Sequence, residues 1–186
     1  MSRNIPICLF VLCVGLLLVF SGCQGIPGKV TGGGKIINEC GEATANFGFN
    51  ADSCDSECGE LVGHFNYVDK GADVKMNGYV VGAEECPGGI DLADPSPICT
   101  ACYDLSSLYG FDGTVYGVEV VYRNTNPKVE GEGGIAYGCV VDNGEGANAD
   151  DADMTFICVE DGPYAGYKNL GKVQGNIQAH ECDDND

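Results

Sequence analysis

Residues 42–51, EATANFGFNA, alternate between apolar and polar side chains along almost their whole length. Alanine and phenylalanine occupy the odd positions, whereas Glu42, Thr44, Asn46 and Asn50 point the other way. A period of two is typical of a strand that buries one face and exposes the other. This stretch therefore predicts a half-buried β-strand.

Six further stretches are rich in strand-forming residues and are separated by glycine and Asp/Asn turns. They are residues 61–68, 74–81, 114–122, 135–141, 154–160 and 173–180. No stretch shows helical periodicity, and short strands between turns indicate a sandwich or barrel. The sequence predicts an all-β fold: a single antiparallel sandwich or barrel-like domain of about seven to nine short strands, with disulfide-stapled loops.

Composition excludes one class of function and supports the domain count. The chain has 186 residues, with 28 acidic against 9 basic side chains, and a formal charge of −19. Such a charge repels phosphate backbones and argues against nucleic acid as a partner. Hydrophobic residues make up 44% of the chain, which is enough for the core of one domain.

The N-terminus has the order of a secretory signal. Arg3 precedes an apolar run over residues 7–20, followed by Ser21 and Gly22. The run has 14 residues, whereas a membrane-spanning helix needs about 20, so we expect cleavage after residue 22. The end of the run, FSGC over residues 20–23, also resembles a prokaryotic lipobox and predicts lipidation of Cys23.

This leader divides the chain. We expect a signal peptide over 1–22, a glycine-rich tether over 23–34, a β domain over 35–182 and an acidic tail over 183–186. Within the β domain, residues 82–110 lack alternation and carry cysteine and proline, so we expect a Cys/Pro-rich insertion there.

Export makes disulfides the default state of the remaining cysteines. Nine cysteines follow Cys23, so its acylation leaves at least one of them outside intramolecular bridges. Without acylation, ten cysteines can close five bridges.

Two pairings follow from the expected strands. If Cys139 faces Cys158 across an antiparallel pair, Val141 shares an apolar face with Met154 and Phe156, as a core face requires. This geometry predicts a Cys139–Cys158 bridge. Because Cys40 precedes the first long strand and Cys182 follows the last, we also expect a Cys40–Cys182 bridge.

The other cysteines gather in two loops, and their pairing cannot be deduced from spacing. They are Cys54, Cys58, Cys86, Cys99 and Cys102. We expect structural disulfides that join the two loops into one cap. A four-thiolate zinc site is the alternative for two of the loop pairs.

Several stretches resemble the post-COAP domain, a β-rich module of exported bacterial and archaeal proteins. They are TGGGKI at 31–36, ANFGFNA at 45–51, VDNGE at 141–145, DMTF at 153–156 and GNIQAH at 175–180. The inserted cysteines depart from the pattern, as does Gln174, where a glycine is usual. The resemblance implies a β fold in an extracytoplasmic setting and implies no activity.

The acidic loop at residues 142–153 offers oxygen ligands of the type that Ca²⁺ prefers, but not in EF-hand spacing. The candidate ligands are Asp142, Glu145, Asp150 and Asp153. A solvated turn is the competing interpretation. His64 and His180 are expected on polar strand faces without a nucleophile motif, so we expect no enzyme.

Four tyrosines lie in expected loops and could stack on sugars or protein partners. They are Tyr103, Tyr109, Tyr164 and Tyr167. The sequence thus predicts an exported, lipid-anchored, non-catalytic β module with a structural or binding role at the cell surface. The alternative is a calcium- or carbohydrate-binding surface protein, and release as a secreted protein is the alternative to anchoring. Neither a firm cofactor nor a choice between protein and glycan partners follows.

Overall fold

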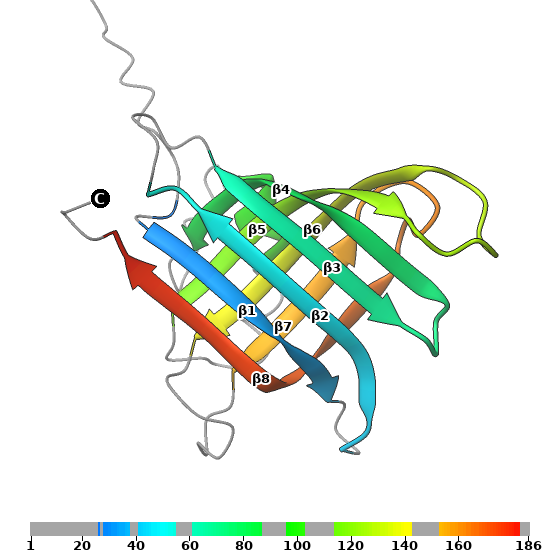
Figure 1. Cartoon of the computed structure of the whole chain (residues 1–186), viewed down its shortest axis with the longest axis horizontal. Coiled ribbons are helices and arrows are strands. Elements are labelled where there is room, and N and C mark those ends of the chain that lie inside the picture. The colour runs from blue at the N-terminus through cyan, green and yellow to red at the C-terminus, as the bar shows by residue number, and fades with distance from the viewer. Residues whose placement is uncertain are drawn as a thin grey trace, which may run out of the picture.

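The computed structural model describes residues 26, 28–37, 41–54, 61–86, 96–102, 114–142 and 153–182. Eight antiparallel strands form a closed barrel in which each strand pairs with the next and β8 pairs with β1 (Figure 1). Their bounds are β1 Gly28–Ile37, β2 Ala43–Asp52, β3 Val62–Asp69, β4 Val74–Cys86, β5 Thr114–Asn124, β6 Gly133–Asp142, β7 Met154–Val159 and β8 Lys168–Glu181. The predicted all-β class is therefore confirmed, as a barrel.

Alternating side chains explain why these segments close around one core. In β2, Phe47 and Phe49 point inward, and in β3 Phe65 and Tyr67 do the same. Burying one apolar face of every strand removes water from the barrel interior, which is the main force that favours folding. The seven strands expected from the sequence correspond to β2–β8.

The expected tether at 23–34 is wrong for residues 28–34, which belong to β1 between β2 and β8 (Figure 1). Val30 and Ile36 of β1 are buried in the core. Glycine is needed here because neighbouring strands come close. A Cβ atom on Gly32 would lie 2.5 Å from Cε1 of Phe49, and one on Gly34 would lie 2.6 Å from the Gln174 carbonyl oxygen.

The expected insertion at 82–110 is also wrong at its start. Strand β4 continues to Cys86 past a bulge between Val80 and Gly82. The bulge shifts the register against β5, which hides the alternation in the sequence. Residues 97–102 then form a short helix, and no described helix is long and apolar enough to cross a membrane.

Strands β6 and β7 are buried on both faces over residues 138–141 and 154–157. Ala136 and Ile157 face the barrel core, while Val141, Met154 and Phe156 belong to a second apolar cluster. The sequence correctly grouped these three residues on one apolar face but placed it inside the barrel. It is the outer face, and it forms one cluster with the cysteines of the 97–102 helix.

Three disulfides join described residues, and they differ from both predicted pairs. They are Cys54–Cys182, Cys86–Cys99 and Cys102–Cys139, with Cα–Cα distances of 5.3, 5.4 and 5.5 Å.

The predicted Cys139–Cys158 bridge is wrong because the β6–β7 register places Cys139 opposite Phe156 and Cys158 opposite Tyr137. Cys139 instead reaches the helix that covers this outer face.

The predicted Cys40–Cys182 bridge is wrong because β1, and not β2, is the neighbour of β8. The ends of β2 and β8 both pair with the start of β1, so Cys182 meets Cys54. Cys40 and Cys58 lie outside the described residues, and the cap expected to join the two cysteine-rich loops is not formed by the bridges present.

Candidate functional site

Two of the four candidate calcium ligands are described, and both accept hydrogen bonds from β8. Asp153 Oδ2 accepts from the Ile177 N–H at 2.9 Å, and Asp142 Oδ2 accepts from the Ala179 N–H at 3.2 Å. The pairing of β8 with β7 ends at Lys172, so these carboxylates take the place of a strand along the exposed edge of β8. Glu145 and Asp150 lie outside the described residues. Within the described ranges, no group of three or more His, Cys, Asp or Glu side chains could hold a metal ion.

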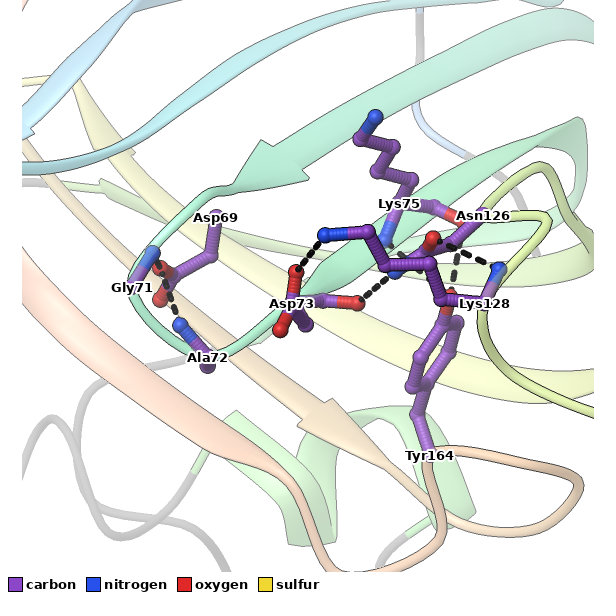
Figure 2. A network of polar contacts seen from close by, with 8 residues as sticks. All are labelled: Asp69, Gly71, Ala72, Asp73, Lys75, Asn126, Lys128 and Tyr164. Carbon is purple, nitrogen blue, oxygen red and sulfur yellow. Dashed lines mark hydrogen bonds and ion pairs between the residues drawn. The ribbon is translucent and has the colours of Figure 1, made fainter.

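The described loop tyrosines make structural contacts, and the expected stacking platform is wrong for Tyr164, whose ring is buried. Tyr164 is 7% exposed, donates to Asn124 Oδ1 at 2.5 Å and accepts from the Lys75 N–H at 3.2 Å. Figure 2 shows its ring rising from the β7–β8 loop toward Lys75 and Asn126. Tyr164 thereby connects this loop to the β3–β4 and β5–β6 hairpins. Tyr103 and Tyr109 lie outside the described residues.

Tyr167 completes a partly buried polar network at the same end of the barrel. Its hydroxyl donates to Asp69 Oδ2 at 2.7 Å and lies 2.6 Å from the Tyr67 hydroxyl. Asn169 Nδ2 donates to Tyr67 at 2.7 Å, and Asp69 Oδ1 accepts the N–H groups of Gly71 and Ala72. Burial raises the pKa of Tyr67 to about 12, and burial followed by its bonds to Tyr67 and Asp69 raises the pKa of Tyr167. These hydroxyls therefore stay protonated and close this end, which we call the closed end.

The opposite end, which we call the mouth, contains a pocket of about 290 Å³. It is lined by Ile26, Val30, Glu85, Tyr116 and Glu181, among others. Burial, then the negative charges of Glu85 and Asp142, raise the pKa of Tyr116. The mouth thus places the carboxylates of Glu85 and Glu181 together with Lys29 and His180 around a protonated phenol.

The exposed apolar side chains gather elsewhere, on the outer surface of β3, β4 and β5. The large hydrophobic residues that are exposed in the described part of the chain are Val62, Tyr79, Val81 and Val121, at 64, 59, 50 and 47% exposure. Strand pairing places His64, Tyr79, Val121 and Ile135 side by side across four strands. The rings of His64 and Tyr79 lie 5.1 Å apart. We call this surface the Tyr79 face.

The charge of the Tyr79 face differs from that of the whole chain. The adjacent row pairs Asn66, Asn77 and Arg123 across β3–β5, and Asn77 Nδ2 donates to Asn66 Oδ1 at 2.6 Å. Neither row contains a carboxylate, although the chain carries 28 of them. Glu119, two positions before Val121 on β5, lies outside these rows. A contiguous exposed apolar surface with amides around it and little charge is typical of an interaction site.

A groove borders this face at the base of the β5–β6 hairpin. It has a volume of about 900 Å³ and is lined by Val121, Arg123, Glu132, Gly133 and Ile135, among others. Val121 and Ile135 therefore belong both to the face and to the groove.

Sequence reasoning missed Tyr79, Val121 and Arg123, although a signal was present. Residues 79–81, YVV, are apolar on both strand faces, and Val121 breaks the alternation of β5. Apolar residues out of phase with the core mark an apolar outer surface, which is exposed on β4 and β5 and covered by the 97–102 helix on β6 and β7.

The chain matches no protein-family model, no curated protein and no solved structure.

Proposed function

We propose that this chain is an exported, lipid-anchored, non-catalytic β-barrel that has a structural or binding role at the cell surface. The observation that carries the proposal is the set of three disulfides among the described residues. Disulfides persist in oxidising compartments and are rare in the cytosol. They support the interpretation of residues 1–22 as an export signal, and the lipobox-like FSGC supports acylation of Cys23.

The fold limits how far the proposed anchor at Cys23 can lie from the barrel. Ile26 is 3% exposed in the core, and β1 begins at Gly28, so only three residue steps separate Cys23 from the barrel. An extended chain spans at most about 3.6 Å per residue, so the anchor lies within about 11 Å of Ile26. The proposed lipid therefore holds the mouth next to the membrane. The closed end points away from it, and the Tyr79 face lies on the side of the barrel.

The contacts of the acidic loop and the loop tyrosines favour this role over the two alternatives. Calcium at Asp142 and Asp153 would compete with the N–H groups of β8 for the same oxygens. Sugar stacking on Tyr164, which is buried, would require breaking its contacts with Asn124 and Lys75.

Intact mass of the protein from its native membrane tests the proposal, with thiols alkylated and bridges left unreduced. Acylated Cys23 leaves nine cysteines, and the three bridges use six of them, so the chain should carry a lipid increment with either one or three alkyl groups. A mass without lipid and with an even number of alkyl groups would mean a released protein. A chain that retains residues 1–22 and has no bridges would overturn export as well.

A further inference from the structure

We infer that the Tyr79 face is the contact between two copies of this chain, with Tyr79 of each copy seated in the groove of the other. This inference supplies a partner for the binding role proposed above and rests on it. It starts from a protruding side chain and a hollow on the same surface.

The protruding side chain is Tyr79, which is 59% exposed in the middle of the apolar row. The groove begins at Val121, the residue paired directly with Tyr79. Because ring and groove belong to one patch, a two-fold axis places each ring in the other copy's groove. Such reciprocal contact is the requirement for an isologous dimer.

The groove walls suit a phenol ring. Val121 and Ile135 provide apolar surface, Gly133 leaves room, and Arg123 provides a guanidinium that can lie on the ring face. Tyrosine and arginine are also the residue types that dominate binding energy at protein interfaces.

Charge favours a second copy over a basic partner. A chain of charge −19 attracts basic proteins to its acidic surfaces, and the two rows of the Tyr79 face carry no carboxylate. Two like-charged copies, by contrast, approach with least repulsion through a surface whose charged side chains include Arg123 and, in the groove, Glu132, and not a cluster of carboxylates. Added salt should strengthen their association because it screens the repulsion that remains.

The size of the Tyr79 face indicates how tightly two copies should associate. Four strands at about 4.8 Å spacing and five residues at about 3.3 Å give a face of roughly 14 by 13 Å. A stable complex buries about 800 Å² per partner, so this contact is small and the dimer in solution is weak. Anchoring in one membrane would raise the local concentration of copies and favour the contact.

Sedimentation equilibrium of the processed chain, residues 23–186 with Cys23→Ser, from micromolar to millimolar concentration at low and high salt, tests the inference. Without the acyl group, its outcome is independent of the mass experiment on Cys23. We expect a monomer at low and a dimer at high concentration, with tighter association in high salt. Tyr79→Asp should raise the dimer dissociation constant by roughly tenfold or more, and Arg123→Gln should weaken the dimer in the same direction.

Asn176→Asp is the matched control, because it adds the same charge at an exposed position of β8, across the barrel from β4. It should leave the dimer intact, and retention of the parent's circular dichroism shows that each variant folds. A parent chain that stays monomeric up to millimolar concentration overturns the inference. Equal weakening by Asn176→Asp and Tyr79→Asp overturns it too, as does a monomer that binds a glycan through Tyr79.

Discussion

Alkaline unfolding should depend on the buried phenol of Tyr67. Its pKa is raised from 10.0 to about 12, first by burial and then by the charge of Asp69, against the lowering effect of the bonds from Tyr167 and Asn169. Between pH 10 and 12 the unfolded chain releases this proton while the folded chain keeps it. The free energy of unfolding therefore falls as pH rises through this window, and the stabilisation is fully present below pH 10. Two pH units at about 1.4 kcal/mol each give a loss of about 3 kcal/mol from Tyr67.

Tyr67→Phe isolates this contribution. At neutral pH the variant should lose about 1–2 kcal/mol, because Asn169 loses its acceptor. Between pH 10 and 12 its stability should fall by about 3 kcal/mol less than that of the parent. Urea unfolding followed by circular dichroism at stepped pH measures both, and Tyr79→Phe on the outer face is the matched control. If Tyr67→Phe loses as much stability over this window as the parent does, the buried phenol is not the cause.

Three further perturbations test the fold. Gly32→Ala should lower the free energy of unfolding in urea by about 1–3 kcal/mol, because the added Cβ atom meets the ring of Phe49. Gly48→Ala should be tolerated, because its Cβ atom meets only one carbonyl oxygen, at 3.9 Å. Equal costs for the two variants would contradict this packing. Removing the Cys54–Cys182 bridge by serine substitution of both cysteines opens a loop of 128 residues and should lower the free energy of unfolding by up to about 5 kcal/mol. Removing the Cys86–Cys99 bridge, which closes 13 residues, should cost about 3 kcal/mol. The reverse order would contradict the loop-entropy reasoning. Asp153→Ala should lower the free energy of unfolding by about 1–3 kcal/mol, because the Ile177 N–H loses its acceptor. A chelator should leave the Tm of the parent unchanged. A rise in Tm with calcium that Asp153→Ala abolishes would support a calcium site instead.

The sequence predicted the strands because burial of one face leaves a local pattern. Alternation at 42–51 identified β2, and weaker alternation identified the six strands from β3 to β8. Alternation also grouped Val141 with Met154 and Phe156. Alternation could not distinguish the inner face from the outer one. The helix over 97–102 covers the outer face of β6 and β7, so both faces of these strands carry apolar residues.

Pairings between distant residues could not be predicted in the same way. Asp142 and Asp153 look like metal ligands by residue type, yet their oxygens bond the edge of β8. The prediction joined Cys182 to Cys40, which precedes the strand at 42–51, yet the partner of Cys182 is Cys54, which follows that same strand, β2. Both outcomes depend on which strands are neighbours, and that information is spread over the whole chain.

Closure of the barrel depends on β1, the strand with the weakest sequence signal. Its inward positions are Val30, Gly32, Gly34 and Ile36, so two of its four core side chains are missing. Phe49 of β2 and Ile177 of β8 approach the space above Gly32 from both sides, and a Cβ atom there would lie 2.5 Å from the first and 3.1 Å from the second. The apolar contribution to the core at this position thus comes from the neighbouring strands, which is why the segment resembles a tether in the sequence. The same glycines bring β2 and β8 close to β1, and the Cys54–Cys182 bridge fastens the ends of these two strands across its start. The glycine-rich segment that follows the proposed lipid anchor is therefore β1, the strand that pairs with both β2 and β8 and so closes the barrel.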